Sequence, residues 1–280
     1  MKQEERNISA AFYIPFAYLY SVRLRSITKL LSWLLLYILP TAFYSSMGYT
    51  GDAWSFALQY TLVLIATFTL YETGYIFNDT LAIRREEHPS LRLNESETAY
   101  FFAHRWSIVL TRLLIAAICL CALSPIINFQ FSILNSQFSI INFQFSILNS
   151  QFSMCLLFAL YNRWRNRYNV FLYVWLVFSR FVPFMCLAGH GAFDYILLFV
   201  SYPLLIGLER FSMPSYRWGL MGKLIPDEPS KARFRAAYYC LALVILVPYC
   251  LYSGRTLYPL TPIAILAVYR ILRLLNNKSI

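Results

Sequence analysis

Charged residues are scarce in this chain. Asp, Glu, Lys and Arg together make up 13% of its 280 residues, whereas a typical soluble domain carries about 25%. Hydrophobic residues make up 59%, so the chain has too few polar groups to cover its own surface in water. This composition excludes an ordinary soluble fold. It predicts a protein of the lipid bilayer, where each helical crossing needs about 20 consecutive apolar residues.

Residue types that mark several common functional sites are also rare. The chain has 9 glycines and no glycine-rich phosphate loop, which argues against a nucleotide-binding enzyme. Its 3 histidines are not spaced as metal ligands. None of its 6 cysteines forms a Cys-x-x-Cys pair, and all lie in apolar stretches. We therefore expect free, buried thiols rather than a zinc site or a disulfide framework.

The apolar stretches predict a single all-α domain, a polytopic bundle of about eight transmembrane helices. Residues 9–20 are also apolar but too short to cross, so we expect them to lie along the membrane interface. The predicted spans are 27–46, 55–77, 106–124, 145–162, 168–188, 193–209, 236–253 and 256–275.

The basic residues follow a one-sided pattern. With eight spans, all 24 Lys and Arg residues except Arg112, Arg180 and Arg255 fall on the side that holds both termini. Because Lys and Arg mark the cytoplasmic side, we expect both termini in the cytoplasm, most simply at a bacterial inner membrane. The net charge of +11 is thus interpreted as a topology signal with some attraction to anionic lipid, and not as nucleic-acid binding.

A tandem repeat lies between the third and fourth predicted spans. Residues 126–139 and 140–153 both read IINFQFSILNSQFS, without any ionisable side chain. The repeat therefore cannot supply acid–base or metal chemistry. We expect the second copy to complete the short fourth helix and the first to lengthen the preceding hairpin; a docking arm or an aggregation-prone strand is the alternative.

Acidic residues line the exit of the second predicted span. Glu72, Asp79 and Glu86 are spaced seven apart, so on a helix they lie near one face over about 21 Å. Carboxylates beside arginines at the mouth of a membrane bundle fit a site where Mg²⁺ and arginines together hold substrate phosphates. The alternative is that Glu72 is protonated or paired with Arg112 or Arg180.

One stretch of this exit carries a family resemblance. NDTLAIRREEHPSLR, residues 78–92, resembles the first acidic motif of the UbiA-type intramembrane prenyltransferases. Asn78 and Asp79 match its opening pair and Glu86 its last acidic position, but Ala82 stands where the family has a middle Asp. The tail that ends in Arg92 resembles the branch that transfers phosphoribose to decaprenyl phosphate.

A second stretch, residues 160–180, resembles the family's Tyr-x-x-x-Lys element. Tyr161 and Arg165 stand at its two defining positions, and Arg180 matches an arginine common in the phosphoribosyl branch. The family's second acidic motif has no clear counterpart, and the family usually has nine spans. Asp227 is the acid in the corresponding loop that we select for a second ion.

The resemblance implies a helical bundle whose cavity opens to the cytoplasm and laterally to lipid, with Mg²⁺ as cofactor. An isoprenoid diphosphate or a polyprenyl phosphate would be the substrate, and a prenyl group would be transferred. By this resemblance the metal ligands would be Asp79, Glu86 and Asp227, the catalytic residues Asp79, Glu86 and Arg165, and the substrate-binding residues Asn78, Glu72, Tyr161, Arg92 and Arg180.

Two other functions stay open at this point. With few carboxylates for two ions, the chain could be a UbiA-like membrane protein that no longer catalyses and binds lipid or a partner. It could also be a small-molecule transporter, for which broken helices interrupted by Gly or Pro are typical. The 9 glycines make that pattern unattractive.

Overall fold

The computed structural model describes residues 8–85, 91–132, 137–164, 168–213 and 219–276, and all regular structure in these ranges is helical. The helices are α1 (Ile27–Trp33), α2 (Leu39–Met47), α3 (Ala53–Thr80), α4 (Glu95–Ser132), α5 (Gln137–Arg163), α6 (Asn169–Ser179), α7 (Val182–Met185), α8 (Ala192–Ser201), α9 (Pro203–Phe211), α10 (Gly219–Leu224), α11 (Glu228–Tyr252) and α12 (Thr261–Asn276). The short turns are η1 (Ala10–Phe12), η2 (Leu19–Arg23), η3 (Leu34–Ile38), η4 (Ala82–Arg85) and η6 (Tyr258–Leu260).

Several of these helices can cross a membrane. In the described ranges, five are long and apolar enough, and α8 with α9 would form a sixth that is bent by 47°. The predicted spans 145–162 and 168–188 fall on α5 and on the shorter apolar stretch Asn169–Met185. The chain is therefore an all-helical, multi-pass membrane bundle. The five helices are Ile27–Met47, Ala53–Arg84, Glu95–Leu123, Glu228–Tyr252 and Tyr258–Asn276.

The outer surface of the bundle is apolar. On α4, Leu110, Leu113, Leu114 and Ile118 are all exposed. In water a continuous patch of this kind would drive aggregation, whereas lipid tails solvate it without cost. The surface thus agrees with the low charge content of the sequence.

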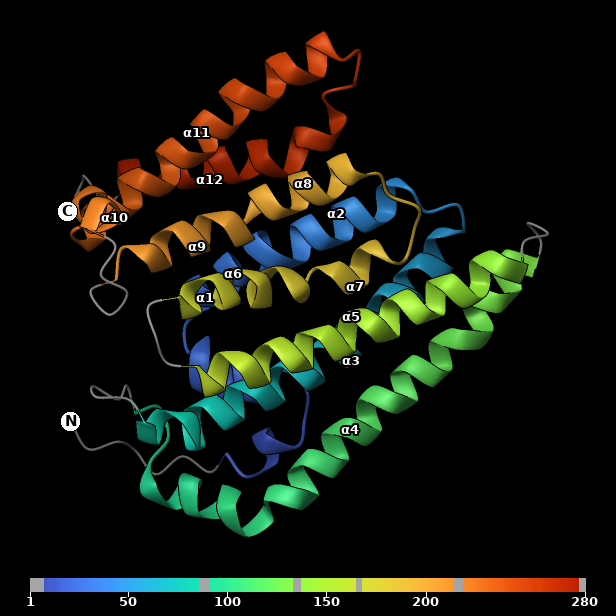
Figure 1. The fold of residues 1–280 in the computed structure, drawn as a ribbon, viewed down its shortest axis with the longest axis vertical. Helices are drawn as coiled ribbons and strands as arrows, with labels where there is room; N and C mark the ends of the chain where they lie inside the picture. The colour runs from blue at the N-terminus through green and yellow to red at the C-terminus, as the bar shows by residue number, and fades with distance from the viewer. Residues whose placement is uncertain (1–7, 86–90, 133–136, 165–167, 214–218, 277–280) are drawn as a thin grey trace.

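Several helices begin or end with basic residues on the same side of the bundle. Helix α1 begins there, and α3, α5, α9 and α12 end there, on the left in Figure 1. The basic residues in the last turns of α5, α9 and α12 therefore lie at the same end of the bundle.

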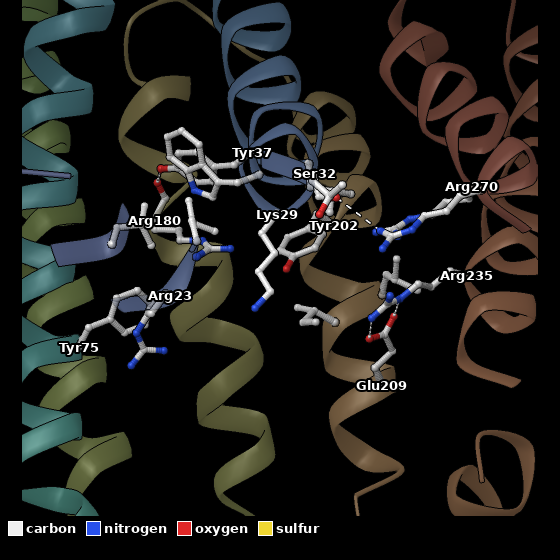
Figure 2. Close-up of a pocket in the computed structure, with 18 of the residues that line it drawn as sticks. Arg23, Lys29, Ser32, Tyr37, Tyr75, Arg180, Tyr202, Glu209, Arg235 and Arg270 are labelled. Carbon is white, nitrogen blue, oxygen red and sulfur yellow. Dashed lines mark hydrogen bonds and ion pairs between the residues drawn. The ribbon is translucent and has the colours of Figure 1, made fainter. Parts of the chain in front are cut away.

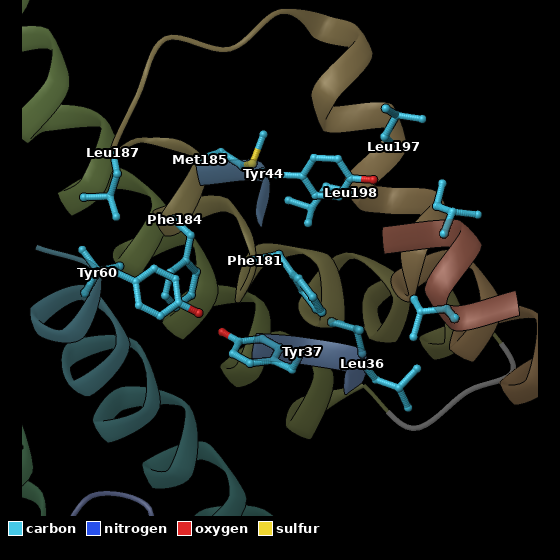
Figure 3. Close-up of a cluster of buried hydrophobic side chains, with 14 of the residues drawn as sticks. Leu36, Tyr37, Tyr44, Tyr60, Phe181, Phe184, Met185, Leu187, Leu197 and Leu198 are labelled. Carbon is cyan, nitrogen blue, oxygen red and sulfur yellow. The ribbon is translucent and has the colours of Figure 1, made fainter. Parts of the chain in front are cut away.

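Aromatic side chains form much of the core between α2, α3, α7 and α8 (Figure 3). The ring of Tyr37 lies 4.7 Å from that of Phe181, and the ring of Tyr60 lies 5.0 Å from that of Phe184. Because lipid tails are as apolar as a protein core, close packing and hydrogen bonds, rather than the hydrophobic effect, hold membrane helices together. The tyrosine side chains provide both the close packing, through their rings, and the hydrogen bonds, through their hydroxyls.

Tyrosine hydroxyls also satisfy the backbone where helices break. Helix α6 ends at Ser179, and the carbonyl of the next residue, Arg180, accepts a hydrogen bond of 2.7 Å from the Tyr37 hydroxyl. At the bend between α8 and α9, Tyr238 and Tyr239 donate to the carbonyls of Val200 and Ser201, both at 2.6 Å. Irregular backbone at membrane depth persists only where such partners exist.

The N-terminal segment, residues 8–24, is folded into the bundle. Phe12 and Tyr18 are fully buried, and Phe12 packs beside Phe101 of α4. The segment therefore packs against α3 and α4, while Ile14 and Tyr20 stay exposed. That residues 9–20 lie along the membrane interface stays a prediction.

The tandem repeat is helical wherever the structure describes it. Residues 126–132 end α4, and the second copy, residues 140–153, lies wholly within α5. The two helices consequently extend beyond their neighbours at the end opposite the basic residues (Figure 1).

Gly74 sets the distance between α3 and α5. A methyl group on its Cα would overlap the ring of Phe158. We expect Gly74→Ala to lower the free energy of unfolding by about 1–3 kcal/mol, as overpacking does in dense cores. Reversible unfolding in mixed detergent micelles would measure the change. The matched control is Gly219→Ala, because a methyl group there meets nothing within 4 Å; equal effects of the two variants would contradict the prediction.

Candidate functional site

A cavity of about 370 Å³ opens among η2, α1, α3, α9 and α12, toward the basic end of the bundle. Figure 2 shows the charged and aromatic side chains that face it. Among the described residues that line it, Glu209 is the single acid, while six are basic. Such an excess of positive charge favours anionic ligands. The basic residues are Arg23, Lys29, Arg180, Arg235, Arg270 and Arg273, and the aromatic ones are Trp33, Tyr37, Phe68, Tyr75 and Tyr202.

Arg180 is the most enclosed of these cations. Arg180 directly follows α6, and the residue is only 7% exposed. The guanidinium carbon lies 5.1 Å from the ring centre of Tyr37, 5.2 Å from that of Tyr71 and 5.7 Å from that of Tyr202. Aromatic faces attract a cation, but they supply no hydrogen-bond acceptor in the plane of the guanidinium.

Arg180 has no acidic partner among the described residues. It makes no ion pair there, and its Nε is buried without a hydrogen-bond acceptor. Burial of an unpaired charge costs free energy. Arg180 is therefore a buried cation without a counter-ion among the described residues.

On the other side of the cavity, one arginine is paired with an acid and one is not. Arg235 of α11 donates two hydrogen bonds to the carboxylate of Glu209 of α9, with Nε–Oε1 and Nη2–Oε2 distances of 2.5 and 2.7 Å. Arg270 of α12 is 5% exposed and its Nε has no acceptor among the described residues. The sequence pattern predicts only a topology charge at Arg270, although a basic residue inside the predicted span 256–275 is also a signal for a functional site.

The carboxylates of Glu72 and Asp79 on α3 already accept hydrogen bonds from other groups of the protein. The carboxylate of Asp79 accepts from Arg23 at 2.9 Å, from Arg92 at 2.8 Å and from the Tyr18 hydroxyl at 3.0 Å. Burial raises the pKa of Tyr18, so its hydroxyl stays a donor. Asn78 lies at 3.5 Å from the same carboxylate. Asp79 thus accepts from four side chains, two of which, Tyr18 and Arg23, belong to the N-terminal segment.

Glu72, two turns before Asp79 on α3, binds the same N-terminal segment. Its carboxylate accepts from the backbone N–H groups of Phe16 and Leu19 at 2.9 and 2.7 Å and pairs with Arg112 at 2.9 Å. Both charged side chains are fully buried. Of the alternatives left open by the sequence, pairing with Arg112 is therefore the one observed.

Of the predicted site residues that the structure describes, only Arg180 lines the cavity. The hydroxyl of Tyr161 accepts from Arg210 at 3.1 Å, outside the cavity lining. Asp227 caps the N-terminus of α11, where it accepts from the Ser230 N–H at 2.7 Å; hydrogen bonds from Ser230 lower its pKa. Glu86 and Arg165 lie outside the described residues.

No family model, curated protein or solved structure matches this chain. The likeness to UbiA-type prenyltransferases therefore stays a prediction from the two quoted stretches.

The described residues do not form a metal site made of protein ligands alone, and Glu86, one of the predicted ligands, lies outside them. No group of three or more His, Cys, Asp or Glu side chains gathers there in a way that could hold a metal. Both oxygens of Asp79 are engaged by Arg23, and one also by Arg92. A Mg²⁺ ion at Asp79 would have to compete with these guanidinium groups for the carboxylate oxygens.

Proposed function

We propose that this protein is an integral-membrane protein that binds the phosphate or diphosphate head of an amphiphile, most simply an isoprenoid, in the basic cavity. The observation that carries the proposal is the buried guanidinium of Arg180, which has no acid beside it among the described residues. A ligand phosphate would supply the missing charge and the missing acceptor at once.

The chemistry of the cavity favours phosphate over a neutral headgroup. Arginine forms forked, charge-assisted hydrogen bonds with phosphate oxygens. Arg23 lies at the cavity with its guanidinium 3.7 Å from the ring centre of Tyr75 and could share the ligand with Arg180. The rings of Trp33 and Phe68 offer apolar surface for a chain.

The proposed orientation in the membrane follows from the charges. Eight crossings, with α5 and the Asn169–Met185 stretch as the fourth and fifth, would place both termini and the basic end in the cytoplasm. The cavity would then open toward the cytoplasm, as expected for a ligand whose headgroup is exposed at the inner leaflet. Prenyl transfer with Mg²⁺ stays the prediction of the sequence resemblance, and binding of the head by cations alone does not depend on it.

Transport of an anionic solute is a second candidate, because two broken helices meet at the cavity. The break after α6 places Arg180 there, and the 47° bend between α8 and α9 places Tyr202 there. Discontinuous helices at a central site are typical of secondary transporters. Flux of a labelled phosphorylated solute into proteoliposomes would favour transport over static binding.

Binding of a prenyl diphosphate tests the proposal. The purified protein in lipid nanodiscs, with EDTA present, is expected to bind farnesyl diphosphate and not farnesol. Arg180→Gln is expected to weaken binding about tenfold to a hundredfold, the equivalent of losing one hydrogen-bonded charge contact of about 1.5–3 kcal/mol. It should not lower the unfolding temperature, since it removes an unpaired buried charge.

The matched control is Arg255→Gln. Arg255 is exposed and also contacts an aromatic ring, that of Phe193 at 4.8 Å, but it does not line the cavity. Equal affinity for the diphosphate and the alcohol, or wild-type affinity in Arg180→Gln, would contradict the proposal.

A further inference from the structure

We infer that Asp79 is an internal counter-ion that competes with the ligand's phosphate head for Arg23, so that Arg23 pairs with Asp79 when the cavity is empty and with the head when it is filled. This inference rests on the proposed function and adds a regulation of the same site. Arg23 belongs to both partners, because it lines the cavity and its Nη2 lies 2.9 Å from each carboxylate oxygen of Asp79.

Arg23 lies close enough to Arg180 to share one ligand head with it. The guanidinium carbon of Arg23 lies 3.7 Å from the ring centre of Tyr75, and that of Arg180 lies 5.2 Å from the ring centre of Tyr71. The two rings belong to consecutive turns of α3, and their centres are 4.8 Å apart. Figure 2 shows both arginines on the same side of the cavity. We therefore expect one diphosphate head to contact both.

Asp79 can release Arg23 without being left unpaired. Its Oδ1 also accepts from Arg92 at 2.8 Å, and its Oδ2 also accepts from the Tyr18 hydroxyl at 3.0 Å. The side chain of Asp79 is fully buried, and a buried carboxylate without donors would cost much free energy. Because each oxygen keeps a donor after Arg23 has moved, the exchange avoids that cost.

The second arginine–acid pair at the cavity lacks this property. Among the described residues, the carboxylate oxygens of Glu209 accept hydrogen bonds from Arg235 alone, and Glu209 is 3% exposed. A ligand that took Arg235 would leave a buried carboxylate without a donor. Arg23 also has an Nε that is buried without an acceptor among the described residues, which a phosphate oxygen could satisfy. Arg23 is thus the arginine whose change of partner costs less.

The inference predicts an unusual sign for a substitution at Asp79. If Asp79 held a metal ion for the ligand, as the family resemblance implies, removing its charge would not tighten binding. If Asp79 competes with the ligand, removing its charge should tighten binding, because the carboxylate no longer holds Arg23. Damage to the fold would also lower the affinity rather than raise it.

A double-mutant cycle on Asp79 and Arg23 tests the inference. The wild type, Asp79→Asn, Arg23→Gln and the double variant are titrated with farnesyl diphosphate in nanodiscs with EDTA present. Asp79→Asn is expected to bind about threefold to tenfold more tightly than the wild type, and Arg23→Gln about tenfold more weakly. The double variant should bind like Arg23→Gln, because Asp79 acts through Arg23. Asp52→Asn, at the exposed N-cap of α3, should not change the affinity.

Two results would overturn the inference: an affinity of Asp79→Asn equal to or below that of the wild type, or a gain that persists when Arg23 is also replaced, which would indicate only a general change of charge. If Asp79→Asn does not fold, Arg92→Gln replaces a half-exposed partner of Asp79. Asp79 should then hold Arg23 more firmly and weaken the ligand, and this effect should vanish in Arg23→Gln; its persistence there, or its absence, would contradict the inference. Failure of the proposed function looks different, because the wild-type protein would then not bind farnesyl diphosphate at all.

Discussion

Arg112→Leu is expected to lower the free energy of unfolding by about 3–5 kcal/mol, the loss found when one member of a buried ion pair is removed. Arg112 and Glu72 are both fully buried, and their charged groups lie 2.9 Å apart. In the variant, the carboxylate of Glu72 would remain in the bundle without its counter-ion. Unfolding of the purified protein by SDS in mixed micelles would measure the change.

The double variant Glu72→Leu with Arg112→Leu is not expected to restore stability. A buried pair can often be replaced by apolar residues at little cost, but this one also binds the backbone of the N-terminal segment. Arg112 donates to the carbonyls of Phe12 and Ala11, and Glu72 accepts from two N–H groups. Each buried backbone group left without a partner costs about 1–3 kcal/mol.

The matched control is Arg105→Leu, because Arg105 lies on the same helix but is exposed beside Trp106. Its effect should stay within about 0.5 kcal/mol, as for most surface substitutions. A double variant as stable as the wild type would show that the two charges serve only each other, and would remove the anchoring role assigned to them.

Asp79→Asn is expected to release the other end of the N-terminal segment. The substitution keeps the shape of the side chain but removes the charge that holds Arg23 and Arg92 and accepts from Tyr18. We expect a loss of about 1.5–3 kcal/mol, the contribution of a hydrogen bond to a charged group. Limited proteolysis in nanodiscs should then cut within residues 8–24, where the wild type resists.

Asp52→Asn provides the control for that experiment. Asp52 is an exposed N-cap of α3 and accepts from the Ser55 N–H at 2.9 Å. Asparagine caps helices about as well as aspartate, so stability and proteolysis should not change. If Asp79→Asn also leaves residues 8–24 protected, the segment is held by packing alone.

For the acids on α3, the sequence predicted their common side but not their partners. Their seven-residue spacing correctly placed Glu72 and Asp79 on a common side, where both contact the N-terminal segment. The spacing also fitted a metal site, and nothing local distinguishes a carboxylate that binds Mg²⁺ from one that binds arginines. The partners of Glu72 and Asp79 lie between 13 and 61 residues away in the chain, beyond the range of any helical periodicity.

The cavity was still harder to predict. Arg180 was selected because it matches an arginine of the family that residues 160–180 resemble, and it does line the cavity. Arg235 and Arg270 were assigned to topology, since a basic residue near a helix end has that role by default. Their second role depends on helices α9, α11 and α12 meeting around Glu209.

The amino-acid sequence alone determined that this protein is helical and belongs in a membrane, and that its basic residues gather at one end. These properties follow from composition and from the order of apolar and charged stretches, since each span must satisfy its own backbone in lipid. The tertiary structure alone decided which charges are neutralised and which remain open to a ligand. That distinction depends on contacts between segments remote in sequence: the N-terminal segment occupies the acids of α3, while Arg180 and Arg270 make no ion pair among the described residues.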